Sequence, residues 1–161
     1  MTVGLKFAGH KNQLMQKTQN LEYPITIIAY SLAVLNNGRL DLNKFAAAIG
    51  LPKYLMKRII DRDIVRKPEC AELDGDVLVL RDSCPSLLYG VLHALMIKGR
   101  VTISFRDKPP YIVLPEKNAI GILINRGIAY VIRKTKEEVT LALTPEFRKY
   151  IETLNTILNT I

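Results

Sequence analysis

The feature that most constrains this chain is an internal repeat. When the second half of the 161-residue sequence is shifted by 61 to 64 residues, three of its segments fall on three segments of the first half. LNNGRLDL (35–42) lies over MIKGRVTI (96–103), GLPKYLMKRIIDRDIV (50–65) over VLPEKNAIGILINRGIA (113–129), and DGDVLVLRD (74–82) over KEEVTLALT (136–144). A period near 62 residues has the size of a small domain, so the repeat predicts two related domains and not a solenoid.

Each copy has the pattern of helices followed by a β-hairpin. In the first copy, apolar residues recur at helical spacing over residues 24–37, and Gly38 ends that helix. Residues 64–67 and 76–80 are rich in β-branched residues and are expected to pair as two strands. Asp74-Gly75 is expected to form the tight turn between them.

Two further helices are predicted between these elements. Asp41 is expected to cap a helix over residues 42–49, because its carboxylate can accept the unpaired amides of the first turn. Gly50 suits the left-handed position after that helix. Pro52 suits the first turn of the next helix, expected over residues 53–63.

Residues 40–65 resemble a helix-turn-helix within a winged-helix protein. The resemblance depends on an apolar–small pair in the first helix, an apolar–Gly–apolar corner and two inward apolar residues in the second helix. These are Phe45-Ala46, Ile49-Gly50-Leu51, and Met56 with Ile59. The resemblance implies an α+β, mainly helical chain with two tandem winged-helix domains, the second degenerate. The implied organisation is a basic arm at 1–23, one domain at 24–82 and another at 83–161.

The charge distribution favours a polyanionic partner, either nucleic acid or an anionic membrane surface. The net charge is +8, and residues 44–67 carry seven positive and two negative charges. If Met56 and Ile59 face the core, the residues between them face outward, where an exposed helix fits the DNA major groove. The expected contacts with double-stranded DNA are made by Lys44, Lys53, Tyr54, Lys57, Arg58, Arg62, Arg66 and Lys67.

Two other interpretations of this basic helix stay open. A basic helix face is often only a solvated surface, and winged helices also serve as protein–protein assembly modules without direct DNA contact. The hairpin that follows is acidic, with one positive and five negative charges over residues 69–82. That hairpin would be repelled by phosphates, so the helix, and not the wing, is expected to contact DNA.

The second copy departs from the helix-turn-helix pattern. Pro109-Pro110 cannot lie inside a helix, so the first helix of the motif is expected to be absent or replaced by extended chain, for example a strand that pairs with residues 101–105. The outward basic set of the first copy is replaced by Glu116, Lys117, Ile120, Gly121 and Ile124. This face is interpreted as an interface, or as part of a rotated helix that buries it within its own domain.

The last 18 residues predict an amphipathic helix that Thr144 caps and Pro145 begins. Its apolar stripe is Phe147, Tyr150, Ile151, Leu154, Ile157 and Leu158. Most such stripes pack on their own domain, but a terminal helix after a degenerate winged helix is also a common dimerisation element. Together with the apolar face of the second copy, this stripe is expected to mediate a homodimer, which would match a palindromic DNA site.

Sequence motifs for catalysis are not found. The chain has no phosphate-binding GxxxxGK loop, no GxSxG and no HExxH, so we expect no enzyme activity and no cofactor or metal. Cys70 and Cys84 form no CxxC pair, and we expect free thiols in an intracellular protein. No apolar run reaches the length of a membrane span, so no membrane partner is expected.

Overall fold

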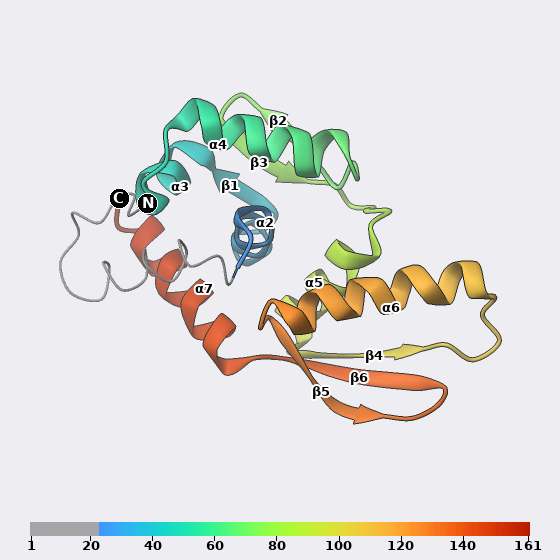
Figure 1. Ribbon diagram of the computed structural model, residues 1–161. Coiled ribbons are helices and arrows are strands. Elements are labelled where there is room, and N and C mark those ends of the chain that lie inside the picture. Colours follow the sequence, from blue (N-terminus) through green and yellow to red (C-terminus); the bar gives the residue numbers. More distant parts are fainter. Residues whose placement is uncertain (1–22) are drawn as a thin grey trace.

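The computed structural model describes residues 23–161, and the predicted arm at 1–23 lies outside this range except for Tyr23 (Figure 1). The fold is α+β, as the sequence predicts, with helices around two three-stranded antiparallel sheets. The first half contains α2 (Ile25–Leu35), β1 (Arg39–Asp41), α3 (Leu42–Ile49), α4 (Lys53–Ile60), a π-helical segment (Asp61–Arg66), β2 (Ala71–Asp74) and β3 (Val77–Leu80). The second half contains α5 (Leu87–Lys98), β4 (Arg100–Ser104), α6 (Pro110–Asn125), β5 (Ala129–Lys134), β6 (Glu138–Leu143) and α7 (Pro145–Leu158).

The two sheets repeat one another in strand order and register. The order is β1-β3-β2 in the first and β4-β6-β5 in the second. Before each sheet a glycine with positive φ follows a helix, and the carbonyl of that glycine accepts a hydrogen bond from the last residue of the central strand. These bonds run from Leu80 N to Gly38 O (2.8 Å) and from Leu143 N to Gly99 O (3.0 Å). The central strands are therefore offset by 63 residues, one more than the sequence alignment of residues 74–82 predicts.

The connection after the first strand distinguishes the two halves. A single helix, α6, occupies the place of α3 and α4, in agreement with the expected loss of the first helix of the motif. The extended segment that was expected to pair with residues 101–105 is not formed, because the chain from Pro110 to Asn125 is helical. Pro110 is the first residue of α6, where its fixed φ suits a helix and its missing N–H has no partner to lose.

The first hairpin strand lies later in the chain than the sequence predicts. Residues 64–67 do not form a strand; the helical turn continues through Arg66, and β2 begins at Ala71. Ile64 is fully buried, as are Met56 and Ile60. These three residues recur every fourth position, so the burial of one continuous helical face overrides the β preference of Ile64-Val65. The tight turn is formed by Gly75-Asp76, between the paired residues Asp74 and Val77.

Helix α2 lies at the centre of the molecule and joins the two halves (Figure 1). It packs against α5, where the Tyr30 and Tyr89 ring centroids are 4.8 Å apart, and against α7. The apolar stripe of α7 is buried as predicted, but it packs on α2 and α3 of its own chain. The stripe is therefore already covered, which removes it as a support for the homodimer. The helix was assigned to the second domain, yet it packs on the first.

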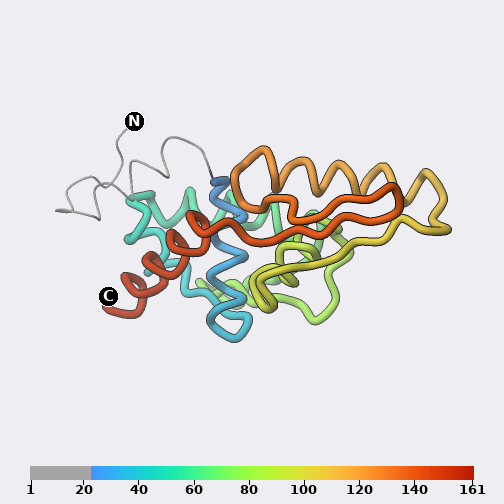
Figure 2. The backbone as a smooth tube through the Cα atoms, turned by 90° about the horizontal axis from the view of Figure 1, so that it is seen from below, coloured from blue at the N-terminus to red at the C-terminus, as the bar shows by residue number. Residues whose placement is uncertain are grey.

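Tyr23 also belongs to this shared core and not to a basic arm. Its ring lies 4.9 Å from that of Phe147 and 5.1 Å from that of Tyr150, and it is buried. By contrast, the β5–β6 hairpin and the beginning of α6 extend away from α2 and α7 (Figure 2). Within residues 23–161, no helix has both the length and the apolar character needed to cross a membrane.

Candidate nucleic-acid interface

Helices α3 and α4 are positioned by local interactions that the sequence predicts. Asp41 Oδ1 accepts hydrogen bonds from the amides of Asn43 (2.9 Å) and Lys44 (3.3 Å), so it caps α3. Gly50 has a φ of 83°, and its amide and that of Leu51 both donate to the carbonyl of Ala46. This turn redirects the chain into α4, which begins directly after Pro52.

Helix α4 is buried on one side and exposed on the other. Met56 and Ile60 are fully buried, whereas Ile59, the second expected inward position, is half-buried. On the opposite side Tyr54 is 68% exposed, and Lys53 and Arg58 are exposed as well. The outward face predicted from the helix-turn-helix spacing is thus present, apart from the half-buried Lys57.

One carboxylate forms ion pairs with two of the lysines that were expected to contact DNA. Asp76, in the turn of the β2–β3 hairpin, forms ion pairs with Lys53 (2.9 Å) and Lys57 (3.0 Å) and accepts a hydrogen bond from Asn43 Nδ2 (3.2 Å). The hydrogen bonds from Lys53, Lys57 and Asn43, in that order, hold the pKa of Asp76 far below its usual range. The backbone carbonyl of Asp76 also accepts from the amide of Leu42 (2.8 Å).

The acidic hairpin turn is therefore docked on the start of α3 and α4. We call the group of Asn43, Lys53, Lys57 and Asp76 the Asp76 cluster. Asn43 and Asp76 were not singled out from the sequence, because only the hairpin pairing brings residue 76 next to residues 43, 53 and 57. The sequence signal for this contact is Asp76 itself, because an Asp beside a turn glycine commonly forms hydrogen bonds through its side chain.

Arg62 and Arg66 are paired with acidic neighbours on their own turn. Arg62 Nε lies 2.8 Å from Asp63 Oδ1, and Arg66 Nε lies 2.8 Å from Asp61 Oδ2. The five-residue spacing of the second pair fits the π-helical geometry of this segment. Both pairs are solvent-exposed, so phosphate can compete for these guanidinium groups.

The remaining expected contacts form a more available set. Within residues 23–161, the side chains of Lys44, Tyr54, Arg58 and Lys67 have no ion pair or side-chain hydrogen bond, and all four are exposed. Lys44 lies on α3, Tyr54 and Arg58 on α4, and Lys67 follows the π-helical segment. We call these four residues the unpaired set. They carry three positive charges and one aromatic ring, which are the groups that bind phosphates and base edges.

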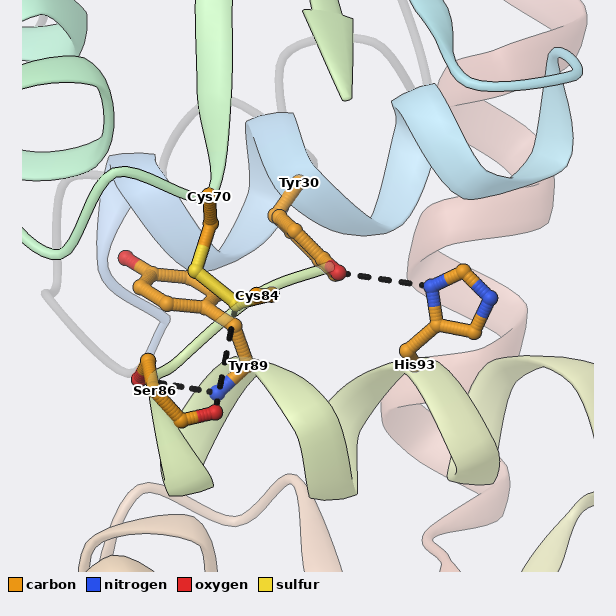
Figure 3. Close-up of a disulfide and its surroundings, with 6 residues drawn as sticks. All are labelled: Tyr30, Cys70, Cys84, Ser86, Tyr89 and His93. Carbon is orange, nitrogen blue, oxygen red and sulfur yellow. Dashed lines mark hydrogen bonds between the residues drawn. A yellow bond between two sulfur atoms is a disulfide. The ribbon is translucent and has the colours of Figure 1, made fainter. Parts of the chain in front are cut away.

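The expectation of free thiols is wrong, because Cys70 and Cys84 form a disulfide (Figure 3). Their Cα atoms are 4.4 Å apart. The two cysteines flank the β2–β3 hairpin, whose antiparallel pairing brings residues 70 and 81 together through a hydrogen bond from Arg81 N to Cys70 O (2.9 Å). Two cysteines on either side of a β-hairpin are the sequence signal for this disulfide. The signal can be used only when the limits of the two strands are known, and the first strand was expected at residues 64–67.

Among residues 23–161, no three His, Cys, Asp or Glu side chains gather in an arrangement that would hold a metal ion. The Tyr30 hydroxyl and His93 Nδ1 are 3.3 Å apart, beside the disulfide (Figure 3). Comparison with models of protein families, with curated proteins and with solved structures finds no match to this chain.

Proposed function

We propose that residues 25–80 form a winged-helix unit that binds double-stranded DNA, with α4 in the major groove, and that the protein is a small transcriptional regulator. The observation that carries the proposal is the exposed face of α4, together with the unpaired set around it. An α-helix fits the major groove, where Arg58 can donate to guanine and Tyr54 can contact a phosphate or a thymine methyl. Lys44 and Lys67, on either side, can bind the backbone phosphates.

The topology of the first half supports the same proposal. Its order of helix, strand, two helices and hairpin, with β1 beside β3, agrees with the winged-helix arrangement that the sequence resembles. The second half repeats the sheet but has one helix between its first two strands. We propose that it is a degenerate winged helix. Its α6 buries Ile120, which is only 7% exposed, but Ile124 on the same expected face is 36% exposed, so the rotated-helix interpretation is favoured for Ile120 alone.

A protein assembly module is the second candidate function. It is favoured by apolar residues exposed at the beginning of α6, where Tyr111 is 78% and Leu114 63% exposed. Exposed apolar residues on one helix are typical of protein interfaces. If this is the function, α4 does not contact DNA, and substitution of its exposed residues should leave the affinity of the protein for DNA unchanged.

The direct test removes two members of the unpaired set. The double variant Lys44→Ala/Arg58→Ala should bind DNA about tenfold or more weakly at 0.1 M salt, because the phosphate contact of Lys44 and the base contact of Arg58 are both lost. Because only Lys44 is assigned to a phosphate, the slope of log K against log salt should become shallower by about 0.9. Fluorescence anisotropy with random and genomic duplexes at several salt concentrations measures both quantities.

The matched control removes the same charge elsewhere. Lys117→Ala/Lys149→Ala removes two exposed lysines, one from α6 and one from α7. DNA affinity should change little in this variant. If both double variants weaken binding equally, the attraction comes from the net charge alone. If neither does, α4 does not contact DNA and the assembly function is preferred.

Asp76→Asn should strengthen DNA binding, in contrast to Lys44→Ala/Arg58→Ala. The amide no longer forms ion pairs with Lys53 and Lys57, so both ammonium groups become free to neutralise phosphates. We expect about threefold or greater tightening and a salt slope steeper by roughly 1 to 2. Asn is well suited to the turn, and the backbone bond from Leu42 is retained.

The control for this variant is Asp74→Asn. The carboxylate of Asp74 lies in the same hairpin, but its ion pair is with Arg39, at 3.8 Å, and not with a lysine of α4. The substitution removes the same charge without releasing a lysine of α4, so any general charge effect is measured separately. Equal tightening in the two variants would contradict a specific role of the Asp76 cluster.

The depressed pKa of Asp76 means that the cluster contributes its full stabilisation to the fold above about pH 5 and loses it as the pH falls further.

A further inference from the structure

A groove of about 570 Å³ lies between α2, α5 and the segment that follows β3. Helix α5 presents Gly90, His93, Ala94 and Ile97 to it, at the spacing of one helical face. The small side chains of Gly90 and Ala94 leave room above the helix, and Ile97 is 61% exposed at one end. The volume is within the range of small-molecule sites in proteins. Nothing in the sequence pattern indicated this groove.

The polar groups of the groove favour an anion. Arg81 on the segment after β3 and His93 and Lys98 on α5 line it, and Asp82 supplies one carboxylate. Among the described residues, Lys98 has no ion pair, and the only ion pair of Arg81 is a 4.0 Å contact with Glu72. One guanidinium and one ammonium group, carried by two different elements, are therefore available to a negatively charged ligand in the groove.

The floor of the groove supplies an oriented hydroxyl. Tyr30 projects from α2 toward His93 on α5, and the two side chains are 3.3 Å apart (Figure 3). Burial, and secondarily the neighbouring Tyr89, raises the pKa of the Tyr30 hydroxyl, so it stays protonated and able to donate at neutral pH. The hydroxyl has one proton, so it can donate to a ligand oxygen, in addition to the ion pairs, when His93 Nδ1 is the donor in the contact between the two side chains.

The wall that carries Arg81 is held in place before any ligand binds. The amide of Arg81 donates to the carbonyl of Cys70, and Cys84 is linked to Cys70 by the disulfide. A wall fixed in this way loses little conformational entropy on binding, which favours affinity.

We propose that this groove binds a small organic anion with a flat apolar body, of the aromatic carboxylate class. The ring would lie over Gly90 and Ala94, and the carboxylate would lie between Arg81, His93 and Lys98. This inference does not depend on DNA binding, and it adds a ligand site to the chain whether or not α4 contacts nucleic acid.

The test uses salicylate and its neutral analogue salicylamide with the ¹⁵N-labelled full chain. Salicylate should shift the amide signals of residues 81–84 and 90–98 in a saturable way, with a dissociation constant of roughly 1 mM or below. Salicylamide should bind about tenfold more weakly, because it lacks the charge that the ion pairs require. Equal affinity for the two compounds would overturn the proposal.

A steric variant with a matched control makes the test sharper. Gly90 and Gly121 both lie inside helices, and a Cβ added at either meets no atom within 4 Å. Gly90→Leu should fill the groove and weaken salicylate binding at least tenfold, whereas Gly121→Leu should leave it unchanged. Both substitutions replace a poor helix former by a good one, so both proteins should remain folded. Equal salicylate binding by the two variants would exclude the groove as the site.

The charge variants provide an independent check. Arg81→Gln and Lys98→Gln should each weaken salicylate binding about threefold, a typical effect for partly exposed charges. Lys149→Gln, on the exposed side of α7, should have no effect. If Lys149→Gln weakens binding as much as Arg81→Gln and Lys98→Gln, the anion is attracted only by the net charge, and the proposal fails.

Discussion

Phe147→Ala is expected to lower the free energy of unfolding by about 3–5 kcal/mol, the usual range for removal of a large buried aromatic side chain. Phe147 is fully buried on α7, and its ring contacts that of Tyr23 at the start of α2. The substitution leaves a cavity where α7 packs on the first half of the chain. Urea unfolding followed by circular dichroism measures the change.

The same variant distinguishes packing within the chain from packing between chains. Because the stripe of α7 is covered by α2 and α3, sedimentation should give the same oligomeric state for Phe147→Ala and the parent protein. Glu152→Ala, on the exposed side of the same helix, is the control and should change stability by less than about 0.5 kcal/mol. Loss of a dimer without loss of monomer stability would show that the stripe serves an interface.

Removal of the disulfide is the second large effect. Cys70→Ala/Cys84→Ala should destabilise the protein by about 3 kcal/mol, because the bond closes a loop over 14 residues and restricts the unfolded chain. For a chain of this size the melting temperature should fall by roughly 6–12 °C. Alanine is preferred over serine, since Cys70 is fully buried and a hydroxyl there would lack a partner.

Thiol titration in denaturant provides the control for this prediction. Without reductant the parent protein should show no reactive thiol, and after reduction it should show both cysteines. Calorimetry of the reduced parent should then reproduce the lower melting temperature of the double variant. Two reactive thiols in the untreated, denatured protein would contradict the disulfide and restore the free-thiol expectation.

The sequence was sufficient where neighbouring residues determine the conformation. The Asp41 cap, the left-handed Gly50 and the start of α4 after Pro52 all depend on interactions within a few residues. The six-residue stripe of α7 follows from helical periodicity, and it is buried as a whole. The repeat also predicted that the second half would resemble the first, and the two sheets share one strand order.

The candidate interface could be predicted from the sequence only in part. Helical spacing indicated that Tyr54 and Arg58 face outward, because Met56 and Ile59 were expected to face the core; both outward residues are exposed. It treated Lys57 in the same manner, although Asp76 holds that lysine half-buried. The difference arises from a contact between residues 19 positions apart, which periodicity does not encode.

The sequence by itself therefore determined the helices, their caps, the repeated sheet and the outward side of α4, because these follow from local hydrogen bonding and from the period of apolar residues. Only the tertiary structure decided that Ile64 joins a helical face, that Cys70 meets Cys84, that α7 covers its own first half, and that a groove opens beside Tyr30. Each of these depends on which distant surfaces bury one another. Such pairing is selected by the packing of the whole core and not by any single segment.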